Sequence, residues 1–254
     1  MSSKIDKLLE YIEKSNKIVF FGGAGVSTES GIPDFRSKDG LYNQKDIKFE
    51  NYPPEYLLSK SCLENHPKVF FEFYKQKMDT RNIEPNITHK VLSRLENLGK
   101  LNAVVTQNID GLHQKAGSKN VYEIHGTTQK NYCNKCKMEY HPDFLFNTRM
   151  DIPTCECGGL IRPDVTLYEE QLPDKTVEEA LAAISNADML IIAGTSLQVW
   201  PASSFISYFS GDHLVVINKE ELMIPFNDEP DLFICDSLGN VFKEVDKYLD
   251  TKTE

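Results

Sequence analysis

The sequence lacks a long apolar run, an excess of positive charge and an N-terminal export signal. No stretch approaches the ~20 apolar residues that a membrane-spanning helix needs, and residues 1–17 have no apolar core beside a cleavage site. The 28 Lys and Arg against 38 Asp and Glu give a net charge of −10, which argues against non-specific binding to a nucleic acid backbone. We therefore expect a cytoplasmic protein with neither a nucleic acid nor a membrane as partner.

Cysteines are few, and four of the six fall into two close pairs, Cys133-x-x-Cys136 and Cys155-x-Cys157. In a reducing compartment such pairs are metal ligands or free thiols rather than disulfides. Four thiolates fill a tetrahedral zinc site and leave no open position for catalysis. The spacing predicts one structural Zn²⁺; two unrelated thiol pairs and a zinc ribbon that reads nucleic acid are the alternatives.

The 254 residues are enough for one large domain, or a large domain with an insertion. About six short apolar stretches, most of them separated by helical patterns, predict an α/β fold with a doubly wound parallel Rossmann-like sheet. We expect the NAD-binding domain in residues 1–36, 86–127 and 166–254, and a small helical and zinc-binding domain in 37–85 and 128–165. The predicted strands are 18–21, 101–106, 121–124, 189–193, 213–217 and 232–234, followed by a terminal helix over 239–249 and a frayed tail over 250–254.

A glycine turn follows the first predicted strand. Gly23-x-Gly25-x-x-Thr28 is an imperfect copy of the dinucleotide fingerprint, and alone it also fits a tight turn without a ligand. Backbone N–H groups of such a turn can close on a phosphate. Gly31 and Pro33 then break the helix almost where it starts. This leaves an acid, an aromatic and a guanidinium on a loop beside the predicted phosphate site: Asp34, Phe35 and Arg36.

The other polar clusters also follow predicted strands. Ligands of open α/β sheets bind beyond the carboxyl ends of the strands, so these side chains are expected to converge there. A lone histidine is usually structural, and the chain has six, so spacing alone does not single out His125. The clusters are Gln107 to Asp110, His125, Thr195 to Ser196, Asn218 and Asp236.

Several long motifs occur in the order typical of one family. They are GAGVSTESGIPDFR (23–36), TQNIDGLH (106–113), the pair His125-Gly126, the four cysteines and GTSLQVWPA (194–202). Over nearly its whole length the sequence resembles the sirtuins, the NAD-dependent protein deacylases. The resemblance implies a bacterial-type NAD-dependent protein deacetylase that acts on acetylated lysines of proteins and yields deacylated lysine, nicotinamide and 2'-O-acetyl-ADP-ribose.

The resemblance also implies roles for individual residues. His125 would be the general base, which suits an imidazole whose ordinary pKa lies near working pH. Asn108 would hold a water or the ribose, and Asp110 would position the nicotinamide together with Phe35 and Ile109. The implied NAD-binding set is Gly23, Ala24, Gly25, Ser27, Thr28, Asp34, Phe35, Arg36, Gln107, Asn108, Ile109, Asp110, Gly194, Thr195, Ser196, Asn218, Lys219, Cys235 and Asp236.

One missing feature agrees with consumption of NAD. A hydride-transferring Rossmann enzyme usually carries an acid ~20 residues beyond its glycine turn for the adenosine ribose. Here that region is a polar loop, and no second strand ends in such an acid. Asn218, after a much later strand, could hold this ribose instead, so NAD would bind in an atypical way.

Substrate contacts are implied for Tyr74, Val165, Thr166 and Tyr168. Most sirtuins have Phe-Gly-Glu where this chain has Tyr168-Glu169-Glu170, so peptide recognition is expected to differ. Sirtuins that remove acidic acyl groups use a Tyr and an Arg three residues later, but Lys77 stands at the second position. Lysine lacks the bidentate fork of arginine, which favours uncharged acyl groups such as acetyl.

Three other functions stay open at this point. A mono-ADP-ribosyltransferase could use the same NAD pocket on another acceptor. A deacylase for longer or acidic acyl groups, and a non-catalytic binding module that depends on NAD or zinc, are the others. The sequence does not determine the oligomeric state; a monomer is the expectation.

Overall fold

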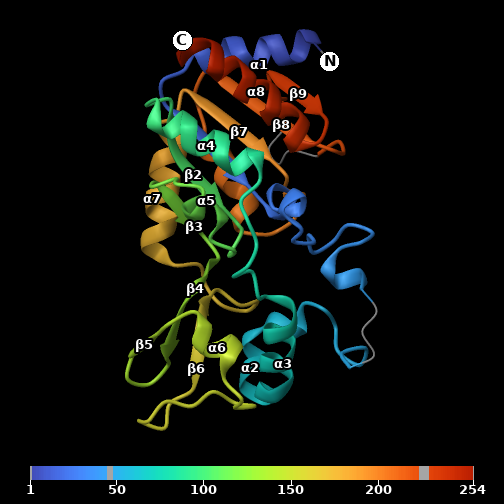
Figure 1. Ribbon diagram of the computed structural model, residues 1–254, viewed down its shortest axis with the longest axis vertical. Helices are drawn as coiled ribbons and strands as arrows, with labels where there is room; N and C mark the ends of the chain where they lie inside the picture. Colours follow the sequence, from blue (N-terminus) through green and yellow to red (C-terminus); the bar gives the residue numbers. More distant parts are fainter. Residues whose placement is uncertain (1, 45–47, 223–228, 254) are drawn as a thin grey trace.

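The computed structural model describes residues 2–44, 48–222 and 229–253, arranged in two parts. Figure 1 shows the larger part, with the main sheet, above a smaller part that holds a second sheet and short helices. The main sheet has six strands in the order β3-β2-β1-β7-β8-β9, and all its pairings are parallel. The strands are β1 (Ile18–Gly22), β2 (Leu101–Thr106), β3 (Val121–Glu123), β7 (Met189–Ala193), β8 (His213–Asn218) and β9 (Leu232–Cys235).

This order confirms the doubly wound sheet, and each of the six predicted strands is present. The direction of winding changes between β1 and β7, which are neighbours in the sheet. In such sheets a crevice opens beyond the carboxyl ends of the two strands at this point. The glycine turn after β1 and the Gly194 turn after β7 therefore both face the expected binding crevice.

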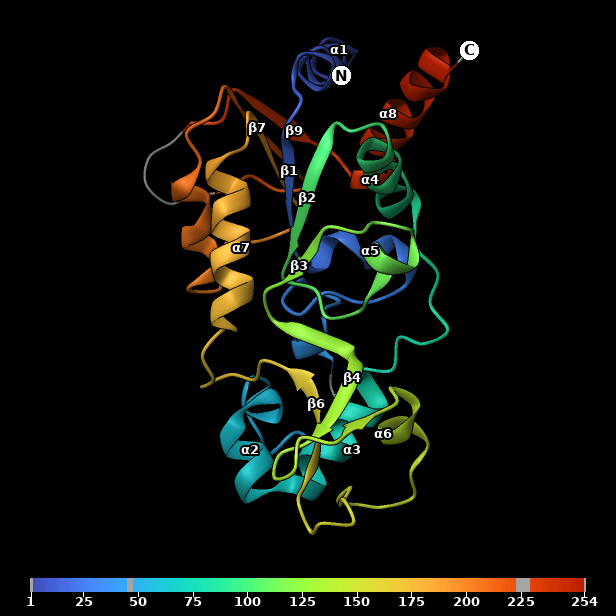
Figure 2. The ribbon, with the colours of Figure 1, turned by 90° about the vertical axis from the view of Figure 1, so that its left-hand side faces the viewer.

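Alternation along the strands divides the interior into two cores. Ile18 and Phe20 of β1 point into one, whereas Val19 and Phe21 point into the other, because successive side chains of a strand face opposite sides. The first core is covered by α1 (Ser2–Lys14), α4 (Ile87–Asn97) and α8 (Leu238–Thr253), the second by α7 (Asp174–Ser185) and the 3₁₀ helix η5 (Ala202–Tyr208). Figure 2 shows these two groups of helices on opposite sides of the sheet.

The smaller part has its own core and its own sheet. The sheet is antiparallel in the order β5-β4-β6, and its core includes aromatic residues of α3 such as Phe70 and Phe71. Cys133 and Cys155 are buried in the same core, so the cysteine ribbon packs on the helices rather than standing alone. The elements are α2 (Lys60–Asn65), α3 (Pro67–Lys77), β4 (Gly126–Cys133), β5 (Glu139–Tyr140), α6 (Asp143–Asn147) and β6 (Ile161–Val165).

Short elements connect the two parts. Residues 37–62 were expected to be a long loop, and their described portion contains only brief helical turns and the first residues of α2. The 3₁₀ turns that follow the glycines are the broken helix start expected from Gly31 and Pro33. These short elements are η1 (Ala24–Val26), η2 (Thr28–Ser30), η3 (Leu41–Asn43), η4 (Tyr56–Leu58) and α5 (Leu112–Lys115).

The expected frayed tail is wrong for residues 250–253, which continue α8; Glu254 lies outside the described residues. Lys252 Nζ lies 2.6 Å from Glu13 of α1, and Asp250 accepts from Arg94 of α4 at 2.9 Å. These contacts with two other helices hold the last turn in place. No helix of the described chain is long and apolar enough to cross a membrane.

Candidate active site

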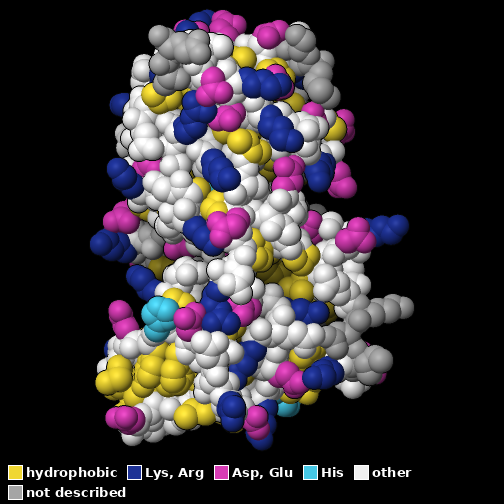
Figure 3. Space-filling view, viewed as in Figure 1, with side chains coloured by type: hydrophobic (Ala, Val, Ile, Leu, Met, Phe, Trp, Pro, Cys, Tyr) yellow, Lys and Arg dark blue, Asp and Glu magenta, His cyan; other side chains and the backbone are white. Residues whose placement is uncertain are grey.

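A cavity of about 640 Å³ lies beyond the carboxyl edge of the main sheet, between the two parts. In Figure 3 a hollow at the waist of the molecule is bordered by hydrophobic side chains. The structure brings most of the predicted site residues together here, while Gly23 and Cys235 lie outside the lining. The lining includes Ala24, Gly25, Ser27, Thr28, Asp34, Phe35, Arg36, Tyr74, Gln107, Asn108, Ile109, Asp110, His125, Val165, Thr166, Tyr168, Gly194, Thr195, Ser196, Asn218, Lys219 and Asp236.

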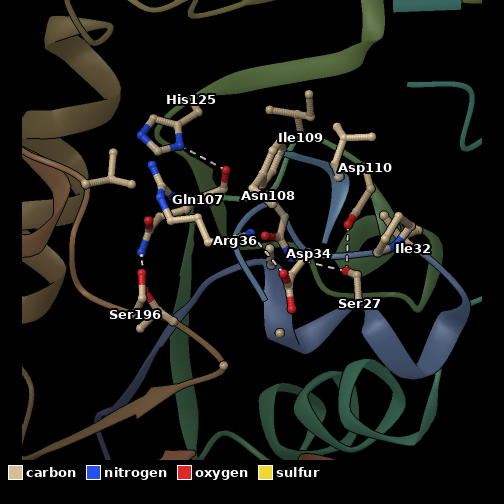
Figure 4. Close-up of a pocket in the computed structure, with 18 of the residues that line it drawn as sticks. Ser27, Ile32, Asp34, Arg36, Gln107, Asn108, Ile109, Asp110, His125 and Ser196 are labelled. Atoms are coloured by element: carbon tan, nitrogen blue, oxygen red, sulfur yellow. Dashed lines mark hydrogen bonds between the residues drawn. The ribbon is translucent and has the colours of Figure 1, made fainter. Parts of the chain in front are cut away.

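His125 is oriented by one backbone carbonyl. Its Nδ1 lies 3.0 Å from the carbonyl oxygen of Gln107, at the end of β2 (Figure 4). Because a carbonyl can only accept, Nδ1 carries the proton and Nε2 keeps its lone pair. Burial lowers the pKa of His125, although the bond to Gln107 opposes this. The side chain is therefore neutral near pH 7 and can accept a proton at Nε2.

Three polar side chains beside His125 form one hydrogen-bonded chain. Ser27 Oγ donates to Asp110 Oδ2 at 2.6 Å and accepts from Asn108 Nδ2 at 3.1 Å. Asp110 Oδ1 also accepts from the Leu112 N–H at 2.9 Å. Burial raises the pKa of Asp110, and the bonds from Ser27 and Leu112 counteract the shift. Since Ser27 gives its only proton to Asp110, it must accept from Asn108, and the orientation of the Asn108 amide is fixed.

The glycines of the first turn allow two loops to touch. The Gly25 N–H donates to Gly194 O at 2.8 Å, and a Cβ on Gly25 would lie 2.8 Å from backbone atoms of Gly194. The Gly23 N–H donates to Ala193 O at 3.3 Å. These two amides already have acceptors in the chain, so both glycines serve the close approach of the β1 and β7 turns. The Ala24 N–H, at the first position of η1, has no intrahelical acceptor.

The loop after η2 is folded around Asp34. Its Oδ1 accepts from the N–H groups of Arg36 at 3.0 Å and Ser37 at 2.8 Å, and its carbonyl accepts from Leu41 at 2.6 Å. An Asp side chain commonly stabilises a turn in this way. The turn places Phe35 and Arg36 at the cavity.

The turns after the last three strands of the chain form the other side of the site. Thr195 Oγ1 accepts from Gln107 Nε2 at 3.1 Å, which joins the β7 turn to the β2 turn. Asn218 Nδ2 donates to the Glu220 carbonyl at 2.9 Å. Cys235 Sγ donates to the Lys219 carbonyl at 3.3 Å, outside the lining. Cys235 thus supports the Lys219 turn from behind.

The segment expected to bind substrate is already paired along much of its backbone. The Thr166 N–H donates to His125 O at 2.8 Å, and the Tyr168 N–H donates to Leu58 O at 3.0 Å. These two amides are thus engaged within the chain. Tyr74 is 1% exposed, and its hydroxyl has no hydrogen-bond partner among the described residues. Lys77 Nζ lies 3.4 Å from Gln44 Oε1, and Lys77 lines the cavity.

The four cysteines of the two pairs form one cluster in the smaller part. Their Sγ atoms all lie within 4.8 Å of one another, with 3.5 Å between Cys133 and Cys157 and 3.7 Å between Cys136 and Cys155. Tetrahedral zinc with Zn–S bonds of ~2.3 Å places its sulfurs ~3.8 Å apart. The cluster therefore fits a structural zinc, and the one-residue gap between Cys155 and Cys157 is compatible with it.

Sequence reasoning missed several lining residues. Ile32 and Pro33 stand inside the GIPDFR motif, so their place in it was an available signal. Trp200, 73% exposed, stands inside GTSLQVWPA. Tyr42 and Met78 also line the cavity, but no periodicity or motif marks them in the sequence.

The model of the Sir2 family matches residues 23–201, more than half of the chain. The chain belongs to the Sir2 family. A Sir2 relative from Clostridium perfringens, named NAD-dependent protein deacetylase, is 53% identical over 248 residues, which cover 96% of this chain and 99% of the relative. A second with the same name, from Clostridium acetobutylicum, is 50% identical over 243 residues, covering 95% and 98%.

Solved Sir2 structures have the same fold. One described as Sir2 bound to acetylated peptide has a TM-score of 0.84 and 33% identity, covering 97% of this chain and 99% of that one. Another, described as Sir2-p53 peptide-NAD+, has a TM-score of 0.81 and 35% identity, covering 98% and 99%. The two-part architecture of this chain is thus that of the Sir2 family.

Proposed function

We propose that the protein is an NAD-dependent protein lysine deacetylase. It would transfer the acetyl group of an acetylated lysine to NAD and release lysine, nicotinamide and 2'-O-acetyl-ADP-ribose. The observation that carries the proposal is the His125 ring, which the Gln107 carbonyl fixes with Nε2 available in the cavity. The names of the Clostridium relatives support the reaction. The solved relatives with acetylated peptide and with NAD+ support the two substrates.

His125 would act as the general base at Nε2. A ribose hydroxyl of NAD is the group from which it would take a proton, because the imidazole is neutral near pH 7. Asn108, held by Ser27, would orient a water or the ribose. Asp110 would position the nicotinamide together with Ile109 and Phe35, all of which line the same cavity.

The rest of the NAD molecule would extend across the carboxyl edge of the sheet. Arg36 supplies a cation and the Ala24 N–H a donor for phosphate. The turns after β7, β8 and β9 supply polar groups for phosphate and the ribose rings. Gly23, Gly25 and Cys235 would support this surface through packing and backbone contacts. The remaining proposed NAD residues are Ser27, Thr28, Asp34, Gln107, Asn108, Gly194, Thr195, Ser196, Asn218, Lys219 and Asp236.

The acyl-lysine would enter between the two parts. Val165, Thr166, Tyr168 and Tyr74 all line the cavity and are the proposed substrate contacts. Because the amides of Thr166 and Tyr168 are engaged within the chain, substrate would meet side chains and carbonyls at these two positions. The buried Tyr74 ring would form part of the apolar wall of the acyl channel.

The four cysteines would hold one zinc ion with a structural role. None of them lines the described cavity, so the metal would stabilise the smaller part without touching substrate. We assign residues 37–85 and 128–165 to this part, and 1–36, 86–127 and 166–254 to the NAD-binding domain. The separate cores of the two sheets support this division.

Incubation with NAD and an acetyl-lysine peptide tests the proposal. Mass spectrometry should show loss of the acetyl group from the peptide and formation of nicotinamide and acetyl-ADP-ribose. Omission of NAD and a matched peptide with unmodified lysine are the controls. ADP-ribose attached to the peptide, with the acetyl group retained, would instead identify a mono-ADP-ribosyltransferase and refute the proposal.

The proposed partner is an acetylated protein, and we propose that the enzyme is a monomer in the cytoplasm. The cysteines of the described chain are free thiols, four of them grouped for a metal, and this usage is typical of a reducing compartment. Light scattering of the purified protein should give the mass of one chain. A mass of two or more chains would refute the monomer.

A further inference from the structure

Two tyrosines join the NAD loop to the substrate segment. The hydroxyl oxygens of Tyr42 and Tyr168 lie 2.9 Å apart, although the residues are 126 positions apart in the chain. Arg36 Nη2 donates to Tyr168 Oη at 3.4 Å, and Arg36 Cζ lies 5.9 Å from the centroid of the Tyr42 ring. All three side chains line the cavity. The contact therefore connects loop 34–44 to segment 165–170.

Tyr168 is fixed firmly to the smaller part. Its N–H donates to Leu58 O at 3.0 Å, and its carbonyl accepts from the Lys60 N–H at 3.0 Å. The next residue, Glu169, has a φ of 74°, a conformation that favours glycine. Its carboxylate accepts from the Ser61 N–H at 2.8 Å, and this bond lowers the pKa of Glu169. The backbone of residues 168–169 is thus held at the first turn of α2.

Tyr42, in contrast, belongs to the loop that carries Phe35 and Arg36. Its N–H donates to Phe35 O at 3.0 Å, and the two rings lie 5.3 Å apart between centroids. Burial raises the pKa of the Tyr42 hydroxyl, and its bond to Tyr168 adds to the effect. Tyr42 therefore keeps its proton at physiological pH. Whatever holds the Tyr42 ring also holds the Phe35 ring.

The geometry assigns Tyr168 as a positioning residue for NAD binding. Its hydroxyl fixes Tyr42 and, through Tyr42, keeps Phe35 and Arg36 at the cavity before NAD arrives. The inference rests on the proposed function, in which loop 34–36 contacts NAD. Phenylalanine, which most sirtuins have at this position, fills the same space but cannot make the bond. The device therefore depends on the tyrosine of this chain.

Tyr168→Phe tests the assignment because it removes one oxygen atom and keeps the ring. The Michaelis constant for NAD should rise about five-fold, which corresponds to the ~1 kcal/mol of one neutral hydrogen bond. kcat and the KM for the acetyl-lysine peptide should not change. Tyr42→Phe should have the same effect, and the double variant no larger one, since both remove the same bond. Tyr208→Phe, which is 53% exposed and outside the lining, is the matched control.

A second measurement needs no turnover. The amides of Gly40, Leu41 and Tyr42 are bonded within the loop, so their hydrogen exchange reports its opening. In Tyr168→Phe these amides should exchange about five-fold faster without NAD. In Tyr208→Phe they should exchange at the wild-type rate.

The two proposals can fail separately. An unchanged KM for NAD together with unchanged exchange would refute the role of Tyr168, even if the wild type deacetylates the peptide. A rise in the KM for the peptide alone would mean that the Tyr168 hydroxyl contacts substrate, and would refute it too. If the wild type does not deacetylate, the proposed function fails. Exchange and the Kd for NAD, measured by calorimetry, then decide whether Tyr168 positions the loop.

Discussion

At the scale of single residues, one backbone carbonyl determines which nitrogen of His125 can act as a base. The sequence identified His125 through its place after a strand and through the His-Gly pair. It could not identify the Gln107 carbonyl as the partner of Nδ1, because that contact depends on how the β2 turn folds. The same is true of Ser27, whose hydroxyl fixes the Asn108 amide across 81 positions of sequence. Motifs thus predict which residues meet, and packing determines which atoms do.

His125→Ala should reduce deacetylation about 100-fold or more, since a positioned base contributes 10²- to 10⁴-fold. The Kd for NAD, measured by calorimetry, should stay close to the wild-type value, because the fold and the NAD-binding residues are unchanged. His141→Ala, a change at a side chain that is 76% exposed, is the control and should keep full activity. Turnover near the wild-type rate in His125→Ala would refute the assignment of the base.

Acyl choice is a second prediction at this scale. A succinyl group would bring a carboxylate into the apolar channel, where Lys77 offers a flexible ammonium and not a bidentate guanidinium. Acetyl-lysine should be turned over much faster than succinyl-lysine. Lys77→Arg should narrow the ratio of kcat/KM values by about ten-fold, the factor given by ~1.4 kcal/mol.

Lys75→Arg is the control for this experiment. Lys75 lies on the same helix, outside the lining, and donates to the carbonyls of Thr148 and Met150. This variant should leave the ratio unchanged. Equal kcat/KM for the two peptides in the wild type would show that Lys77 already serves as arginine would.

At the scale of elements, the cysteine ribbon and α3 share one core. Cys133 and Cys155 are buried against aromatic residues of the helix, whereas the sequence predicted a ribbon with little core of its own. Spacing alone identified the four ligands. It could not reveal that the ribbon lies on α3, because this contact joins segments far apart in the chain. Loss of zinc should therefore loosen α3 as well as the ribbon.

The purified protein should carry one zinc per chain, measured by elemental mass spectrometry. Cys155→Ser should lose the metal and lower the Tm by about 5 °C or more, since zinc contributes folding free energy to such sites. Activity should fall indirectly. Cys235→Ser, an exposed cysteine outside the cluster, should keep its zinc. A full equivalent of zinc in Cys155→Ser would exclude that residue as a ligand.

At the scale of the whole molecule, stability should depend on pH through two buried histidines. The rings of His89 in α4 and His113 in α5 lie 4.7 Å apart between centroids. Burial lowers the pKa of His89 from 6.5 to about 4. Burial, and secondarily His89, lower the pKa of His113 well below 6.5. The unfolded chain therefore takes up protons near pH 6.5, while the folded chain does not.

The free energy of unfolding should thus fall as the pH drops from 6.5 toward 4. Each histidine contributes up to about 1.4 kcal/mol per pH unit in this window. Urea unfolding at several pH values measures the slope. His113→Gln should reduce the slope, and His141→Gln, on the surface, should not. An equal slope in wild type and His113→Gln would contradict the prediction.

Much of the whole architecture was predictable because parallel strands impose simple geometry. Six apolar stretches gave six strands, and the polar residues that follow them met at one edge of the sheet. The last turn of α8 was not predictable, since Lys252 and Asp250 are held by α1 and α4. The same limit applies to Tyr42, whose position depends on a contact with Tyr168 across the cavity. Local patterns reveal elements and their ends, and long-range contacts then modify both.

His125 also lies at the covalent junction of the two sheets. The preceding Ile124 N–H donates to Thr106 of the main sheet at 3.0 Å, and the His125 carbonyl accepts from Thr166 beside β6 at 2.8 Å. Gly126 has a φ of 74°, and a Cβ there would lie 2.1 Å from Asp164 O. The imidazole is thus mounted on the hinge itself. Any rotation of one sheet against the other turns the ring, so closing the cleft and aiming the base are a single mechanical motion.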